Sequence, residues 1–302
     1  MTTVVATDLD RTMIYSRAAI DSVTPPGQVP PLRCVEMLDG REQSFMTVHA
    51  ARWLTLIGAA TVLVPVTTRT PAQFARVTLP GGSRYAVTSN GGNLVVDGMV
   101  DDDWRRRVEA KIAGDGASLA EIGAGLDRCA AGSWVLNRKV ADDLFCYVVV
   151  DLSTLPVSFL ADWTRWCAAR GWVVSMQGRK IYALPRGLTK EAALGEVMIR
   201  TGADRLLAAG DGALDAGFLA MADAAIRPPH GELAETDWRV AHLRISEAIG
   251  VLAGEEMSGW LAAQLGLDIG APECVAADRA ISANMLMSPM TLPGEDETTT
   301  GR

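Results

Sequence analysis

Cysteine is scarce in this sequence, and long apolar runs are absent. The five cysteines, at positions 34, 129, 146, 167 and 274, are scattered and form no CxxC pair. This spacing argues against a disulfide framework or a zinc site and favours a reducing cytoplasm. No apolar stretch approaches the roughly 20 residues that cross a bilayer, and residues 1–4 lack the basic segment of a signal peptide. We therefore expect a cytoplasmic protein without a membrane partner.

Positive charge is also in short supply. The chain has 28 lysines and arginines against 36 acidic residues, a net charge of −8, so nucleic acid is not an expected partner. Lysine occurs only at positions 111, 139, 180 and 190, which makes each one a candidate for a specific role. With 302 residues, of which 49% are apolar, the chain is long enough for one large domain or two ordinary ones.

The order of the expected elements indicates an α/β fold. Strands are expected at residues 4–7, 62–66, 85–88, 206–209, 224–226 and 242–245, and helices at 48–59, from 71, and at 190–200, 213–222 and 250–265. Alternating strands and helices predict a Rossmann-like, doubly wound parallel sheet. Pro65 fits poorly in a central strand because it donates no ladder hydrogen bond. Residues 15–44, with their four prolines, are expected to be irregular apart from a hairpin near 34–42 that turns at Asp39-Gly40.

An insertion interrupts this pattern. Residues 94–185 carry helix-like stretches at 104–113 and 157–169 and two hairpins at 135–150 and 172–184, which is typical of a separate α+β unit. We expect an α/β core in residues 1–93 and 186–267, the inserted unit in 94–185, and a C-terminal extension in 268–302. The polar end, residues 293–302, is expected to be disordered.

Two pairs of carboxylates follow expected strands, at the edge where open α/β sheets gather ligands. Asp8 and Asp10 would repel each other unless a cation is present, and Mg²⁺ prefers such oxygen ligands; a simple turn is the alternative. Asp211 lies between two glycines, and Asp215 stands one helical turn further on. Helix capping would explain this second pair equally well.

A lysine and a threonine-rich loop complete the candidate residues. Lys190 stands at the start of a helix, the unfavourable end for a cation, so a cluster of carboxylates is its expected partner unless it is simply solvated. Residues 67–70 place hydroxyl groups between a strand and a helix, which is a natural phosphate cradle. Capping of the helix by Thr70 is the alternative there.

Taken together, these segments resemble the haloacid dehalogenase (HAD) superfamily. The matching features are Asp-x-Asp-x-Thr at residues 8–12, Thr67 at the end of the second strand, Lys190 at a helix start, and Gly-Asp-x-x-x-Asp at 210–215. The resemblance spans nearly the whole chain. The insertion, after the third strand and before the lysine, resembles the C2-type cap of the Cof-type and sucrose-phosphatase-like branches, which also carry an Asn-Gly pair like Asn90-Gly91.

The resemblance implies a Mg²⁺-dependent phosphatase that hydrolyses a small, sugar-phosphate-like metabolite. Asp8 would attack phosphorus and form an aspartyl-phosphate, and Asp10 would act as general acid and then base. Thr67 would bind the transferring phosphoryl group and Lys190 would neutralise its charge. The implied metal ligands are Asp8, the carbonyl group of Asp10, and Asp211, with Asp215 helping directly or through water.

The sequence also departs from the family pattern. Arg11 and Thr68 stand where glycine is usual, and Leu214 where asparagine is frequent. Arg11 either reads a second anionic group of the substrate or points into solvent. Other candidate substrate contacts are Thr68, Arg69, Asn90 and Gly91 in the core, and Arg138, Lys139, Arg179 and Lys180 in the cap. His230 either touches substrate or is a structural loop residue.

Two other functions remain open from the sequence. The same scaffold supports a phosphotransferase or mutase, which returns phosphate to a second hydroxyl group rather than to water. A non-catalytic HAD-like regulatory or binding protein is the other alternative. The sequence does not determine the oligomeric state.

Overall fold

The computed structural model describes residues 1–24 and 27–268. The expected disordered end at 293–302, and nearly all of the expected extension from 268 onward, lie outside these residues. No helix in the described ranges is long and apolar enough to cross a membrane.

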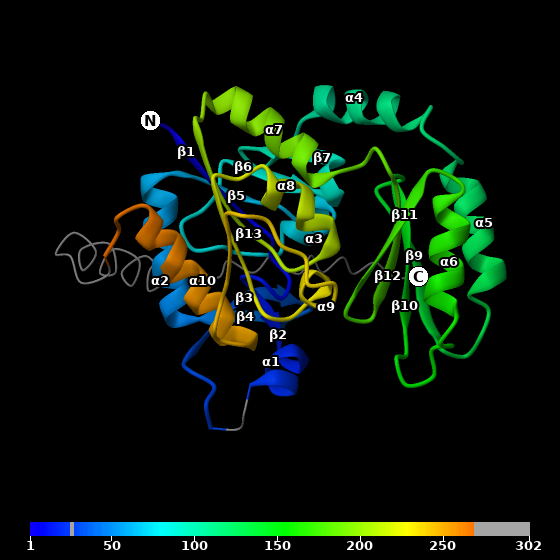
Figure 1. Cartoon of the computed structure of the whole chain (residues 1–302), viewed down its shortest axis with the longest axis horizontal. Coiled ribbons are helices and arrows are strands. Elements are labelled where there is room, and N and C mark those ends of the chain that lie inside the picture. Colours follow the sequence, from blue (N-terminus) through cyan, green and yellow to red (C-terminus); the bar gives the residue numbers. More distant parts are fainter. Residues whose placement is uncertain (25–26, 269–302) are drawn as a thin grey trace, which may run out of the picture. The chain divides into compact units, whose positions relative to one another are not determined.

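A five-stranded parallel sheet forms the centre of the α/β core (Figure 1). Its strand order is β15-β14-β13-β1-β5, and every pairing is parallel. The strands are β1 (Thr3–Thr7), β5 (Val62–Pro65), β13 (Arg205–Ala209), β14 (Ala224–Arg227) and β15 (Leu243–Ile245). This sheet confirms the predicted fold class.

Helices cover both faces of this sheet. Along β1, Val5 packs with one hydrophobic cluster, whereas Val4 and Ala6 pack with another, as the two-residue period of a strand requires. The first cluster includes apolar residues of α2 (Val48–Ala60) and α10 (Gly250–Gln264), which contact each other. The second includes α7 (Lys190–Thr201) and α8 (Ala216–Ala220). β1 is therefore buried on both faces, which explains its uninterrupted apolar sequence.

Pro65 is tolerated because of where its nitrogen points. β5 is the last strand of the five-stranded sheet, and the Val66 N–H donates to the Thr7 carbonyl oxygen of β1 at 2.8 Å. Successive N–H groups of a strand alternate in direction, so the Pro65 nitrogen faces away from β1. β5 is thus an edge strand of this sheet, in which the missing N–H of Pro65 interrupts no bond with β1.

The third expected strand, β6 (Tyr85–Thr88), belongs to a separate sheet. It pairs antiparallel with β7 (Asn93–Val96), which pairs with β8 (Met99–Val100). A single bridge between Val66 and Val87 joins β6 to the end of β5.

The segment after β1 is more regular than expected. It contains β2 (Tyr15–Ser16), α1 (Arg17–Val23), β3 (Leu32–Leu38) and β4 (Arg41–Thr47), and the strands form a three-stranded sheet. The predicted turn at Asp39 and Gly40 is present, with φ values of 50° and 69°. Helix α1 was not predicted. The Ser16 side chain caps it by accepting from the Ala19 N–H at 3.2 Å, and the prolines follow the helix rather than interrupt it.

The inserted region contains a four-stranded antiparallel sheet of order β11-β12-β10-β9. Its strands are β9 (Val135–Ala141), β10 (Phe145–Val150), β11 (Trp172–Gln177) and β12 (Lys180–Pro185), and its helices are α4 (Asp102–Ile112), α5 (Leu119–Cys129) and α6 (Phe159–Ala168). We call this region the cap; its boundaries at 94 and 185 stay a prediction. Helix α5 was missed because Gly123 and Gly125 lower its helix propensity.

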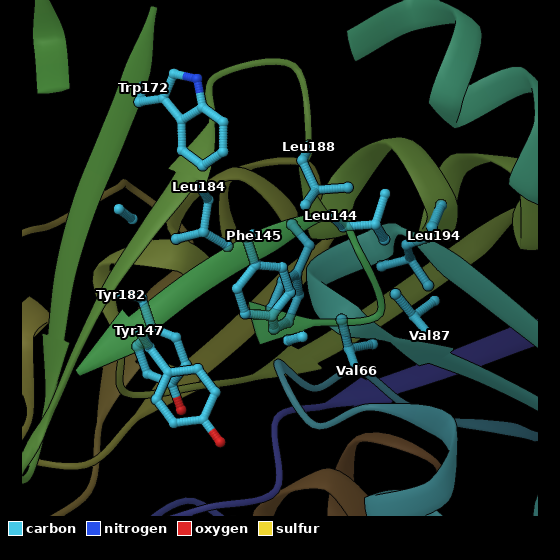
Figure 2. Packing of buried hydrophobic residues seen from close by; sticks show 14 of the residues in the cluster. Val66, Val87, Leu144, Phe145, Tyr147, Trp172, Tyr182, Leu184, Leu188 and Leu194 are labelled. Carbon is cyan, nitrogen blue, oxygen red and sulfur yellow. The ribbon is translucent and has the colours of Figure 1, made fainter. Parts of the chain in front are cut away.

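The cap and the α/β core share one hydrophobic cluster. Leu144, in the β9–β10 turn, and Leu188 lie close to Leu194 of α7 and Val87 of β6 (Figure 2). The expected helix at 213–222 is shorter than predicted: a 3₁₀ turn over Ala213–Asp215 precedes α8. The remaining short helices are α3 (Pro71–Phe74) and α9 (Glu232–Glu235).

The predicted cap of α2 by Thr47 can be tested by mutation. Its hydroxyl group caps α2 by accepting from the Ala50 N–H at 3.0 Å, as predicted. We expect Thr47→Ala to lower the free energy of unfolding by about 1 kcal/mol, because one buried N–H loses its acceptor. Denaturant unfolding would measure the loss. Thr47→Ser keeps the hydroxyl group and should recover most of the stability; equal losses in both variants would contradict the capping role.

Candidate active site

Asp8 and Lys190 form a buried ion pair where β1 ends. The Asp8 N–H donates to the Ala209 carbonyl oxygen at 2.8 Å, which joins the loop after β1 to the loop after β13. The Lys190 ammonium, 0% exposed, donates to Asp8 Oδ1 at 2.7 Å and to Asp215 Oδ1 at 2.6 Å. A fully buried lysine needs such partners, and the carboxylates predicted for it are present.

Asp211 adds a third carboxylate to this place. One ligand oxygen each from Asp8, Asp211 and Asp215 lies within 4.8 Å of the others. Thr12 donates its hydroxyl proton to Asp211 Oδ1 at 3.1 Å. We call Asp8, Asp211, Asp215 and Lys190 the acidic cluster; within it three carboxylates face one ammonium.

The excess of negative charge changes the ionisation of the acidic cluster. Burial, together with the neighbouring Asp215 carboxylate, raises the pKa of Asp8 to about 7, although Lys190 opposes the rise. Burial and the Asp8 carboxylate raise the pKa of Asp211 well above its usual range. A hard divalent cation would compensate this charge, and the ligand atoms are all carboxylate oxygens. The residues present therefore fit Mg²⁺.

Both carboxylate oxygens of Asp215 already accept hydrogen bonds from protein donors. Its Oδ1 accepts from Lys190, and its Oδ2 accepts from the N–H groups of Asp211 at 3.0 Å and Gly212 at 2.8 Å. These contacts fit a residue that positions Lys190 and the loop after β13. They favour the indirect form of its predicted metal role.

The loop after β6 fixes the start of α7. Asn90 Nδ2 donates to the Leu188 carbonyl oxygen at 2.8 Å. Gly91, with φ of 93°, packs so closely on the Thr189 carbonyl oxygen that a Cβ atom would overlap it. Asn90 and Gly91, predicted substrate contacts, thus hold the backbone that presents Lys190. Neither lines the cavity described below.

Asp10 is held by Arg69. The guanidinium group donates from Nε to Asp10 Oδ2 at 2.7 Å and from Nη2 to Oδ1 at 2.8 Å. Its Nη1 lies 2.8 Å from Oε1 of the buried Glu36 on β3, which also pairs with Arg76. We call Arg69, Asp10, Glu36 and Arg76 the Arg69 network. Burial alone would raise the pKa of Asp10, but the hydrogen bonds and charge of Arg69, together with the charges of Lys180 and Lys190, hold that pKa below its ordinary value.

The threonines after β5 have separate roles. Thr67 is buried, and its hydroxyl oxygen accepts from the Arg69 N–H at 3.1 Å, which leaves its own proton free to be donated. Thr68 is buried and hydrogen bonds to Tyr182 of the cap. Thr70 caps α3 in a reciprocal arrangement with Gln73, as the alternative reading of the sequence proposed.

A cavity of about 580 Å³ opens beside these groups. The α/β core contributes Asp10, Arg11, Asp211 and His230, and the cap contributes Arg179 and Lys180. The segment around α1 closes another side with Tyr15, Ser16 and Ser22. This contribution was not predicted, because α1 itself was not predicted.

The cap cations predicted to contact substrate separate into two groups. Arg179, in the turn between β11 and β12, and Lys180, the first residue of β12, line the cavity. Arg138 does not: its Nε lies 3.5 Å from Asp127 Oδ1, and its guanidinium donates to the Ala130 carbonyl oxygen. The prediction for Arg138 is therefore corrected, because α5, which carries Asp127, had not been predicted. Lys139 does not line the cavity either.

His230 supports the loop after β1. Its Nε2 lies 2.9 Å from the Arg11 carbonyl oxygen. A carbonyl oxygen can only accept, so Nε2 carries the proton in this contact. Burial lowers the pKa of the ring, which keeps it neutral. His230 both holds this loop and lines the cavity, so the two readings of the sequence are compatible.

Two acidic residues of this region were missed. Glu36 is distant in sequence from Asp10 and reaches it only through Arg69. Glu232, on α9, accepts from Ser175 Oγ at 2.6 Å and from the Met176 N–H at 2.7 Å, so it ties the α/β core to β11 of the cap. Neither lies in a motif, and only the folded chain places them here.

Three solved structures with a similar fold are phosphatases. The sucrose-phosphatase from Synechocystis, solved with sucrose and phosphate, has a TM-score of 0.56 and 16% identity, over 86% of this chain and 98% of its own. A HAD subclass IIB sugar phosphatase has a TM-score of 0.55 and 10% identity, over 88% and 99%. A HAD phosphatase from Bacteroides thetaiotaomicron has a TM-score of 0.50 and 12% identity, over 88% and 96%.

The chain has the HAD phosphatase fold. The similarity extends over nearly the whole length of each of these structures, cap included, so the fold expected from the resemblance is confirmed. No protein-family model and no curated protein matches the sequence. At 10–16% identity the HAD fold is what these neighbours establish.

The close approach of Gly91 to residue 189 can be tested with a matched glycine. Gly91 and Gly98 both have positive φ, 93° and 82°, but a Cβ atom at Gly98 would meet nothing within 4 Å. Gly98→Ala should cost about 1 kcal/mol of stability from backbone strain alone. We expect Gly91→Ala to cost roughly a further 1–3 kcal/mol, because α7 must shift. Equal losses in denaturant unfolding would contradict the close approach.

Proposed function

We propose that this protein is a Mg²⁺-dependent phosphatase that hydrolyses a small phosphorylated metabolite through an aspartyl-phosphate on Asp8. The observation that carries the proposal is the acidic cluster. It places a buried carboxylate against a buried ammonium, beside two further carboxylates, at the wall of a metabolite-sized cavity. Perturbed carboxylates in a cleft are typical of catalytic sites.

The metal would be held by Asp8, Asp211 and the backbone carbonyl group of Asp10. When bound, it would withdraw charge from the phosphoryl oxygens. Asp215 would act on Lys190, since its two oxygens are already taken by protein donors.

Asp8 would be the nucleophile. Lys190 holds Asp8 Oδ1, so Oδ2 is the oxygen that forms the bond to phosphorus while the bond to the leaving oxygen breaks. Asp10 would give its proton to that leaving oxygen. Asp10 would then take a proton from the water that attacks the aspartyl-phosphate, and inorganic phosphate would leave as Asp8 is restored.

The Arg69 network implies a change on substrate binding. Asp10 must carry a proton to act as an acid, but Arg69 holds it ionised in this structure. An incoming phosphoryl group offers Arg69 a competing anion, so its arrival would loosen the pair and let Asp10 take up a proton. The Thr67 hydroxyl group, beside Arg69, would donate to the same phosphoryl oxygens.

The size of the cavity and the neighbouring folds support a small substrate. A volume of about 580 Å³ lies within the range of small-molecule sites. One similar structure is a sucrose-phosphatase with sucrose and phosphate, and another is a sugar phosphatase. A sugar phosphate or a metabolite of similar size is therefore the substrate class that we propose.

Phosphate release is the direct test of the reaction. A panel of sugar phosphates and p-nitrophenyl phosphate should give inorganic phosphate with Mg²⁺ and none with EDTA. Asp8→Asn should lower kcat by at least about three orders of magnitude, because the nucleophile is lost. Asp162→Asn, on an exposed face of α6, is the matched control and should leave kcat unchanged.

Each contrary result has a distinct meaning. Transfer of the phosphoryl group to a second hydroxyl, with little inorganic phosphate, would replace the phosphatase proposal by a phosphotransferase. No turnover on any substrate, from folded protein that binds Mg²⁺, would indicate a binding role.

Metal binding can be measured without catalysis. Because a ligand that binds only the folded state stabilises it, saturating Mg²⁺ should raise Tm by several degrees at neutral pH. Asp211→Asn removes a ligand and should abolish most of this shift, whereas Asp162→Asn should keep it. An equal shift in wild type and Asp211→Asn would place the metal elsewhere.

A further inference from the structure

We propose that the substrate carries a second anionic group, a carboxylate or a second phosphate, which is bound by Arg11, Arg179 and Lys180. We call these three residues the cavity cations. The proposal rests on the proposed function, because it concerns the part of the substrate that is not transferred.

Arg11 is held in place beside Asp10. Its backbone has φ of 65°, a conformation that is unfavourable for a residue with a Cβ atom. Two contacts maintain it: the Arg11 N–H donates to the Ile14 carbonyl oxygen at 2.8 Å, and the Arg11 carbonyl oxygen accepts from His230 at 2.9 Å. The side chain is partly buried and lines the cavity, so it does not extend into bulk solvent. A strained position that is held from both sides is typical of a functional residue.

Arg179 and Lys180 reach the same cavity from the cap. Arg179 lies in the turn between β11 and β12, and Lys180 is the first residue of β12. Glu232 of the α/β core holds the strand before that turn through Ser175 and Met176. The Arg179 carbonyl oxygen accepts from the Val150 N–H at 2.8 Å. The turn is therefore fixed from the α/β core and from within the cap, and the two cations line the cavity together with Arg11.

In the described part of the chain the cavity cations form no close ion pair, although Arg11 opposes the rise in the pKa of Asp211 and Lys180 helps to lower the pKa of Asp10. No ion pair within 4.0 Å joins any of the three to a carboxylate in residues 1–24 and 27–268. Arg179 is near enough to Asp151 to help Ser153 lower its pKa, and Lys180 lies 5.8 Å from the Tyr147 ring centre. Both remain available to an anion in the cavity.

The balance of charge indicates more than one anionic group. A divalent cation together with Lys190 would offset the three carboxylates of the acidic cluster. The Arg69 network is neutral as a whole, with two guanidinium groups and two carboxylates. No ion pair within 4.0 Å in the described residues then offsets the three cavity cations, and one phosphoryl dianion would balance only two of them. A carboxylate or a second phosphate would supply the missing negative charge.

Matched substrate pairs test this inference. Glucose 6-phosphate is compared with 6-phosphogluconate, glycerol 3-phosphate with 3-phosphoglycerate, and fructose 6-phosphate with fructose 1,6-bisphosphate. We expect the more anionic member to have a kcat/KM roughly 10- to 100-fold higher in at least one pair, as for one or two charge-assisted contacts. The first two pairs report on a carboxylate and the third on a second phosphate. The preference should decrease as ionic strength rises.

Substitution of single cavity cations tests which of these residues cause the preference for the more anionic substrate. Arg11→Gly removes the cation and also relieves the backbone, so it should fold at least as well as wild type. This variant should lose about tenfold more in kcat/KM for the more anionic member of a pair than for its less anionic partner, and Arg11→Lys should recover part of that difference. Arg179→Ala should behave like Arg11→Gly. Arg165→Ala, which removes an exposed cap arginine paired with Asp162, should leave the preference unchanged.

The outcomes separate the two proposals. Turnover without any preference for the anionic members would overturn this inference and leave the phosphatase proposal intact. The same holds if Arg11→Gly and Arg179→Ala keep the full preference. No phosphate release from either member of any pair, in wild-type protein that gives a Mg²⁺-dependent Tm shift, would overturn the proposed function itself.

Discussion

The buried ammonium of Lys190 is the interaction on which the rest of the site depends. A lysine with no exposure is stable only if its charge is matched, since an unpaired buried ion costs several kcal/mol. Asp8 and Asp215 supply that match, and Asp211 then leaves the cluster with an excess of negative charge. Burial and this excess together raise the pKa values of Asp8 and Asp211, and the excess creates the demand for a cation. The acidic cluster thus accounts for the ion pairs of Lys190, for the fit to a metal ion and for the position of Asp8, the proposed nucleophile.

Much of the surrounding structure serves to place this ammonium and the neighbouring Asp10. The loop after β6 holds the backbone before α7 through Asn90 and the absence of a side chain at Gly91. Asp10, by contrast, is fixed from the side by Arg69, which is itself held by a hairpin that follows β1. Asp8 and Asp10, the proposed nucleophile and general acid, are therefore held by contacts from different elements. An ionised Asp10 in the resting structure fits such a division.

In the proposed function, elements outside the parallel sheet would select the substrate. The cavity is enclosed by the segment around α1, by the β11–β12 turn of the cap and by the loop that carries Arg11. Glu232 connects the strand before this turn to the α/β core by accepting from the Met176 N–H. The same carboxylate also accepts from the Ala213 N–H at 3.0 Å. The HAD fold can keep the same chemistry while these surrounding segments change. Distant identity to sugar phosphatases is compatible with a different, more anionic substrate.

The α/β class, the inserted cap and the meeting of Asp8, Lys190 and Asp211 could be predicted from the sequence alone. This was possible because parallel strands end at one edge of a sheet, so residues that follow strands meet there whatever their separation in the chain. The sequence did not determine α1, α5, the edge position of β5, the partner of Arg138, or the roles of Glu36 and Glu232. These depend on contacts between segments distant in sequence, which leave no local pattern of periodicity or spacing. Only the tertiary structure decided that Arg11, Arg179 and Lys180 line one cavity, because strand pairing and core–cap packing bring them together.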